Sequence, residues 1–160
     1  MKKIFYSVLG VGILATPVIA AMAFTKPSFP ETFYADTNVL CLPRGHRDLE
    51  IVWKMQLTIM VDGVPETVPH NIGNTMACVT ELHTHEAGGV VYAEFYDEGR
   101  AAQLTFADFF AVWGESLERE GYTYTLLKGS EQVDSLNFSL APAQEVTITY
   151  TSSATSTSSK

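Results

Sequence analysis

The chain has 160 residues, with 10 Lys and Arg against 18 Asp and Glu, so its formal net charge at neutral pH is −8. This acidic balance argues against nucleic acid and against an anionic membrane surface as partners, because both carry negative charge. The length suits one folded domain with a hydrophobic core.

The first 23 residues have the pattern of a secretory signal peptide. Lys2 and Lys3 precede an apolar run that ends in Ala21-Met22-Ala23, a small-x-small pattern typical of a cleavage site. The alternative is an uncleaved anchor, since about 20 apolar residues are long enough to span a bilayer. Either way we expect the rest of the chain to be secreted or extracytoplasmic, with a membrane partner only if this segment is retained.

The remaining chain divides into an arm, a domain and a tail. Residues 24–40 are expected to be an extended arm or linker, because their prolines and aromatic residues follow no period. Residues 41–150 are expected to form a single domain, and residues 151–160, nearly all Ser and Thr, a disordered tail. The only two cysteines, Cys41 and Cys78, predict a disulfide bond, because an isolated pair is usually joined in an oxidising compartment. A thiolate metal ligand is the alternative.

Period-two patterns dominate the domain. Residues 51–61 alternate apolar with mixed side chains and predict a long strand with one apolar face. Asp62-Gly63 is a signal for a type I′ hairpin. Residues 64–68 are therefore expected to return as a short strand, which Pro65 and Pro69 confine to an edge or to an early end.

A second hairpin is predicted over residues 83–94, turning at its two glycines. His83 and His85 are spaced i, i+2, so in a strand they point to the same side. Pairing of His83 with Tyr92 would set the register and bring two carboxylates to the same face. The residues that this face would offer to a metal ion are His83, His85, Glu94, Glu81 and Tyr92.

These residues predict a copper or zinc ion as the cofactor, because both metals are coordinated by imidazole nitrogen and carboxylate oxygen. His46 and His70 are further candidate ligands, and a disulfide from Cys41 to Cys78 would draw His46 toward the hairpin. Met76 is a soft donor that would favour Cu(I). The alternative is that the paired histidines are simply solvated on the hairpin surface.

One amphipathic helix is expected. Thr105 is a good N-cap and Asp108 occupies the third helical position, an acidic form of the capping box. Gly121 is expected to end the helix. The apolar stripe, expected to pack on a sheet, consists of Phe106, Phe109, Phe110, Trp113 and Leu117.

Further strands are expected over residues 122–127 and 146–150, where apolar residues again alternate. Hairpins followed by a helix and more strands predict an α+β fold: a mixed, mostly antiparallel sheet with one amphipathic helix, similar to a β-grasp. A β-sandwich with an added helix is the alternative.

Three segments resemble a family of exported or membrane-anchored prokaryotic domains with no established activity. They are Leu82-His83-Thr84-His85-Glu86, Val90-Val91-Tyr92-Ala93-Glu94 and the run from Thr105 to Gly114. Members of the family carry Leu-His-Thr-His-Asp, a Gly turn, His-x-Glu and then Phe-Phe-x-x-Trp-Gly. The resemblance implies export, the same hairpin and a cluster of three histidines in relatives. This chain has Tyr92 where relatives place the third histidine.

Three functions are compatible with these patterns. The first is a non-enzymatic extracytoplasmic metal-binding domain, acting as carrier, buffer or sensor. The second is a structural or interaction module of an extracellular or cell-surface assembly, which would use the arm to form a homo-oligomer or to bind a cell-surface protein. The third, and the least favoured, is a small zinc hydrolase with Glu86 or Glu81 as general base.

Overall fold

The computed structural model describes residues 32–153 of the chain. The predicted signal peptide, the first part of the predicted arm and most of the predicted tail lie outside these residues. Between residues 32 and 153, no helix is both long enough and apolar enough to cross a bilayer.

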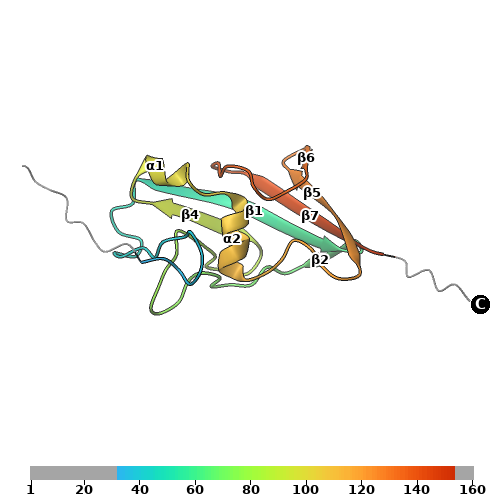
Figure 1. The fold of residues 1–160 in the computed structure, drawn as a ribbon, viewed down its shortest axis with the longest axis horizontal. Coiled ribbons are helices and arrows are strands. Elements are labelled where there is room, and N and C mark those ends of the chain that lie inside the picture. The colour runs from blue at the N-terminus through green and yellow to red at the C-terminus, as the bar shows by residue number, and fades with distance from the viewer. Residues whose placement is uncertain (1–31, 154–160) are drawn as a thin grey trace, which may run out of the picture.

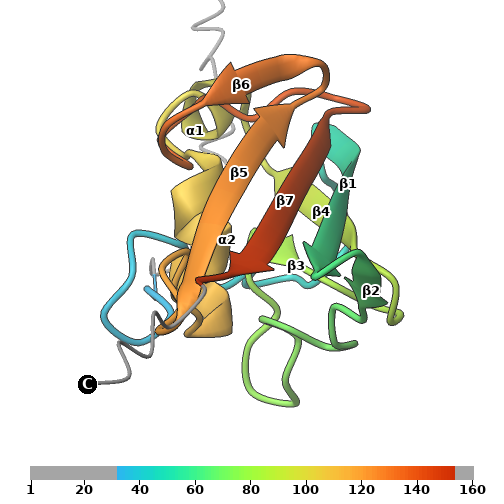
Figure 2. The same cartoon turned by 90° about the vertical axis from the view of Figure 1, so that its right-hand side faces the viewer.

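The described strands belong to one mixed sheet (Figure 2). They are β1 (Ile51–Val61), β2 (Val64–Glu66), β3 (Leu82–His83), β4 (Val90–Phe95), β5 (Tyr122–Lys128), β6 (Glu131–Val133) and β7 (Glu145–Ser152). Their order is β3-β4-β1-β7-β5-β6, with β2 paired to the second half of β1. Neighbouring strands are antiparallel except β1 and β7, which form a parallel pair in the middle. The α+β prediction is confirmed, and the described strands do not divide into the two sheets of a sandwich.

The first predicted hairpin is confirmed. Met55, Leu57 and Ile59 on β1 are buried, while the residues between them are half-buried, as the period-two pattern requires. Asp62 and Gly63 both have positive φ, +49° and +81°, which is the conformation of a type I′ turn.

The predicted helix forms but is shorter than expected. α2 (Phe106–Trp113) begins with the predicted capping box of Thr105 and Asp108 and ends at Gly114, whose φ is +78°. The expectation that Gly121 ends the helix was wrong, because the left-handed Gly114 already donates its N–H to Phe110 O and closes the last turn. A second, short helix, α1 (Glu98–Ala101), was not predicted.

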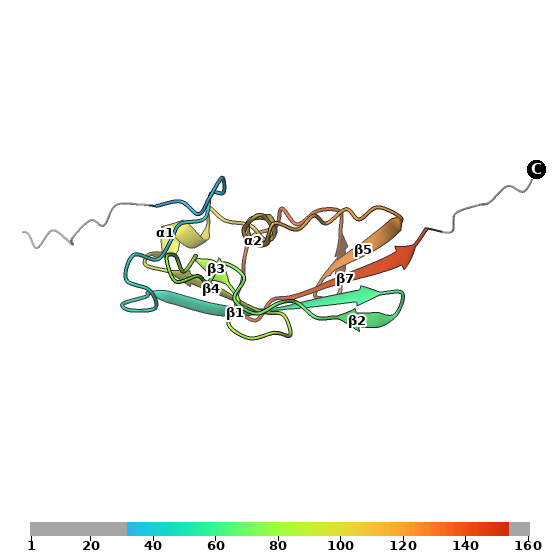
Figure 3. The same cartoon turned by 90° about the horizontal axis from the view of Figure 1, so that it is seen from below.

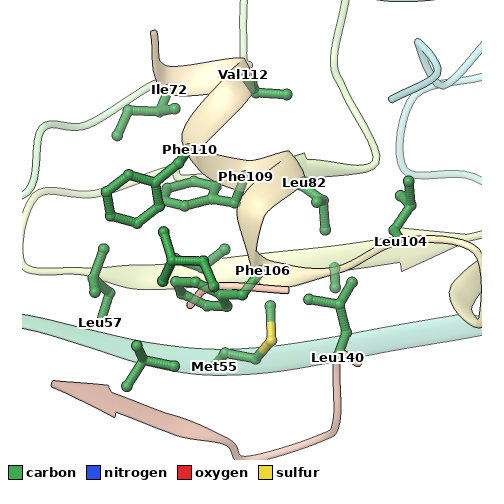
Figure 4. Packing of buried hydrophobic residues seen from close by; sticks show 14 of the residues in the cluster. Met55, Leu57, Ile72, Leu82, Leu104, Phe106, Phe109, Phe110, Val112 and Leu140 are labelled. Atoms are coloured by element: carbon green, nitrogen blue, oxygen red, sulfur yellow. The ribbon is translucent and has the colours of Figure 1, made fainter. Parts of the chain in front are cut away.

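The core lies between α2 and one face of the sheet. Both helices lie on the same side of the sheet (Figures 1 and 3). In Figure 4 the three phenylalanines of α2 point toward the aliphatic side chains of the strands. Burying each ring stabilises the fold by roughly 1.5–3 kcal/mol, so the aromatic stripe is a packing feature.

The chain before β1 packs on the domain. Val39 is fully buried, and Phe33 pairs with Leu40 in a short bridge. The predicted disulfide between Cys41 and Cys78 is confirmed, with the two Cα atoms 5.3 Å apart. The packed part of the chain therefore begins before Cys41.

Candidate metal centre

The candidate ligands lie on the face of the sheet opposite α2. Leu82 and Ala93 are paired and fully buried on the helix side. Successive side chains in a strand point to opposite faces, so the next pair, His83 and Tyr92, points to the other side. The predicted register of the hairpin, which places His83 opposite Tyr92, is thus the observed one.

Three imidazoles and one carboxylate converge on that face. His46, His83, His85 and Glu94 each offer one ligand atom, and these atoms all lie within 4.8 Å of one another. His83 Nε2 is 3.1 Å from His85 Nε2, and His46 Nδ1 is 2.6 Å from Glu94 Oε2. Metal–nitrogen bonds of about 2.0–2.1 Å in a tetrahedral site separate the ligand atoms by roughly 3.3 Å. Small side-chain movements would therefore fit the four residues around one ion.

His83 is held with one ring nitrogen directed at the cluster. Its Nδ1 lies 2.8 Å from the carbonyl oxygen of Thr80. A carbonyl only accepts a hydrogen bond, so Nδ1 carries the proton and Nε2 presents its lone pair. Burial lowers the pKa of His83 to about 4, although the Thr80 carbonyl and the Glu94 carboxylate oppose this shift. The ring is therefore neutral at physiological pH, the form that a metal ion binds.

His85 is positioned through the residue before it. Thr84 is fully buried; its N–H donates to Ile72 O at 3.0 Å and its hydroxyl donates to Pro69 O at 3.0 Å. The Asn74 side-chain amide nitrogen lies 3.3 Å from His85 Nδ1. Without an ion, this amide donates to Nδ1, and His85 Nε2–H then donates to His83. Flipping the Asn74 amide would place its oxygen beside His85 Nδ1, which would then carry the proton. His85 Nε2 would be unprotonated and could bind a metal ion.

Glu94 and His46 form the second pair of the cluster. Glu94 lies on β4, and its side chain is 6% exposed, whereas the His46 side chain is 43% exposed. A buried carboxylate requires a partner, and here the imidazole of His46 supplies it. The same oxygen could bind a cation in place of that hydrogen bond.

Tyr92 forms a wall of the cluster. Its ring stacks on His83 with the centroids 5.6 Å apart and meets His85 edge-on at 4.6 Å. Lys54 is the residue that pairs with Tyr92 on the neighbouring strand β1, and its ammonium lies 5.1 Å from the centroid of the Tyr92 ring. Tyr92 was itself a predicted ligand, and the structure places its ring against the two hairpin histidines.

Glu81 lies apart from the cluster, although it was among the candidate ligands. Both of its carboxylate oxygens contact the Arg100 guanidinium at 2.9–3.1 Å, and one also accepts from Leu40 N–H at 2.9 Å. Desolvation raises the pKa of Glu81, and the hydrogen bonds from Arg100 act against that shift. Its carboxylate fastens the N-terminal segment and α1 to the sheet.

Of the three remaining candidate ligands, one lies in the cluster and two do not. His46 joins the cluster; its only signal in the sequence was its closeness to Cys41, whose disulfide draws the loop toward the hairpin. His70 and Met76 are exposed loop residues outside the cluster, and Met76 is fully exposed.

Three surface cavities lie elsewhere on the domain. The largest, about 480 Å³, is lined by Glu50, Glu98 and the first residues of β1. The others, of about 410 and 320 Å³, lie at β5 and at the start of β7. None of these three cavities is lined by a residue of the cluster.

Comparisons with protein-family models, with curated proteins and with solved structures find no match.

Proposed function

We propose that this chain is an extracytoplasmic domain that binds one copper or zinc ion and acts as a carrier, buffer or sensor. The observation that carries the proposal is the convergence of His46, His83, His85 and Glu94 within 4.8 Å. Two of these residues, His83 and Glu94, are buried. A bound ion would replace the hydrogen bonds that they make with His85 and His46, so neither group would be left without a partner.

The donor atoms favour a borderline transition metal. Three imidazole nitrogens with one carboxylate oxygen suit Zn²⁺ and Cu²⁺ better than Mg²⁺ or Ca²⁺, which prefer oxygen ligands. Four protein ligands also fill a tetrahedral site, whereas catalytic zinc sites keep one position open for water or substrate. This count supports binding over catalysis.

Two features support a location outside the cytoplasm. The Cys41–Cys78 disulfide is typical of proteins in oxidising compartments. The sequence of residues 1–23 has the signal-peptide pattern. Detection of the protein in the extracytoplasmic fraction of its host, without residues 1–23, would test both inferences.

Calorimetric titration of the metal-stripped protein with Zn²⁺ and with Cu²⁺ tests the proposal. We expect one ion per chain for the wild type and loss of binding for His83→Ala. His70→Ala is the matched control, because His70 is an exposed histidine outside the cluster. Absence of saturable binding in the wild type, or equal binding by both variants, would refute the proposal.

A second candidate function is an interaction module of a cell-surface assembly. The observation that favours it is Phe33, which is 51% exposed where the described part of the chain begins. A homo-oligomer or a cell-surface protein would cover this ring. Replacing the exposed ring in Phe33→Ser should then reduce the mass measured by light scattering, and an unchanged mass would count against this function.

A further inference from the structure

We infer that His46 is the exchangeable ligand of the metal centre, and that an external imidazole can take its coordination position during transfer of the ion. The external group would be a histidine side chain of an acceptor protein. This inference rests on the proposed function and adds to it the route by which the ion leaves.

The four ligands differ sharply in exposure. His83 is fully buried and the Glu94 side chain is 6% exposed, but the His46 side chain is 43% exposed. An approaching ligand therefore meets His46 first. We therefore expect the external ligand to replace His46, because the other two imidazoles lie deeper in the fold.

The ligands also differ in how their backbones are held. His83 and Glu94 lie on paired strands, and His85 follows Thr84, which is fixed by hydrogen bonds to the loop at residues 69–72. His46 lies in the irregular segment between Cys41 and β1. The segment can shift without breaking a pair of strands in the sheet.

Both ends of this segment are fastened, so its movement is limited. At one end Leu42 N–H donates to Val79 O at 2.7 Å beside the disulfide, and at the other Glu50 N–H donates to Phe95 O at 2.9 Å. In the middle, the Tyr96 hydroxyl accepts from Arg44 N–H and donates to Gly45 O. His46 can therefore leave the ion and return to it, while the loop stays attached to the sheet.

Exchange at this position needs no redox chemistry. The bond from the metal to His46 breaks, and a bond from the metal to the external imidazole forms, while His83, His85 and Glu94 keep their bonds. One neutral imidazole replaces another, so the charge of the centre is unchanged. The ion is then held by this chain and the acceptor together, and it leaves only when further acceptor ligands replace His83, His85 and Glu94 in turn. Each metal–ligand bond that breaks is matched by one that forms, so the ion is not released to water.

The surface beside His46 carries charges of both signs. The exposed residues Arg47 and Asp48 follow His46 in the loop, Lys54 lies over the Tyr92 ring, and the exposed Glu86 follows His85. An incoming imidazole is neutral, so these charges do not oppose its approach.

Rescue by free imidazole tests this inference on the full mature chain with Zn²⁺ as the probe. We expect His46→Ala to bind one Zn²⁺ with an affinity at least about 10- to 100-fold lower than the wild type, since even outer-shell changes cost this much. Millimolar imidazole should recover most of that loss and slow the transfer of Zn²⁺ to a chromophoric chelator. Imidazole should not rescue His83→Ala, because the position of His83 is closed to solvent.

The outcomes separate this inference from the proposed function. One outcome is that the wild type binds Zn²⁺, while His46→Ala is folded by circular dichroism but neither binds Zn²⁺ nor responds to imidazole. This result overturns the inference and leaves the proposed function standing. Wild-type affinity in His46→Ala also overturns it, because His46 is then no ligand. Failure of the wild type to bind Zn²⁺ or Cu²⁺ overturns the proposed function itself.

Discussion

Removing the disulfide should destabilise the domain and leave the metal centre intact. The two cysteines are 37 residues apart in the sequence. In the chain-entropy model, opening a loop of this length lowers the free energy of unfolding by about 4 kcal/mol at 25 °C, because the unfolded chain gains conformations. The double variant Cys41→Ala/Cys78→Ala should show a loss of this size.

The folded state has other contacts that keep the two segments together. Leu42 N–H donates to Val79 O at 2.7 Å, and Glu81 N–H donates to Leu40 O at 3.0 Å. His46 should therefore stay beside the hairpin, and the Zn²⁺ affinity of the folded variant should remain within a few-fold of the wild type.

Urea unfolding in the presence of a chelator measures the first effect without the stabilisation that a bound ion adds. Zn²⁺ titration of the folded variant measures the second. A loss of stability below about 1 kcal/mol would refute the chain-entropy reasoning. Loss of Zn²⁺ binding by a folded variant would show that the covalent bond itself positions His46.

Three further changes address the cluster and its supports. In metal-free protein, the free energy of unfolding should fall by roughly 3 kcal/mol between pH 6.5 and 4, because the pKa of His83 is lowered to about 4 in the folded state and only the unfolded chain binds its proton in this window. Urea unfolding of His83→Gln should lack this contribution, and equal pH dependence in both proteins would contradict the reasoning. Gly73→Ala should lower the free energy of unfolding by at least about 2 kcal/mol, because φ is +64° and the added Cβ would lie 2.2 Å from Thr80 Oγ1. The variant should also bind Zn²⁺ more weakly, because Thr80 orients His83. An unchanged melting temperature would refute this. Glu81→Ala should cost about 3 kcal/mol in thermal unfolding, because Arg100 loses its buried partner, yet leave the Zn²⁺ affinity within a few-fold; loss of binding would identify Glu81 as a ligand.

The parts of the fold that local chemistry determines were predictable from the sequence. The long strand β1 follows from strict alternation, and its turn follows from Asp62-Gly63, which tolerates positive φ. The start of α2 follows from the capping box of Thr105 and Asp108. The end of α2 was misplaced because Leu117 continues the apolar period beyond Gly114, where the backbone already leaves the helix.

The candidate site was predictable only where one hairpin holds it. The period of two in a strand places His83 opposite Tyr92 and puts Glu94 on the same face. The direction of the Glu81 side chain was not predictable, because its partner Arg100 lies on α1, a helix that the sequence did not predict. His46 reaches the cluster from a distant segment, and the disulfide was its only signal in the sequence.

Elemental analysis of the mature protein, purified without chelator, tests the central claim most directly. The double variant His83→Ala/His85→Ala, purified in parallel and checked for folding, is the comparison. We expect close to one copper or zinc ion per chain in the wild type and none in the variant. Equal metal content in both proteins, or no metal in either while both are folded, would contradict the assignment of this cluster as a metal centre.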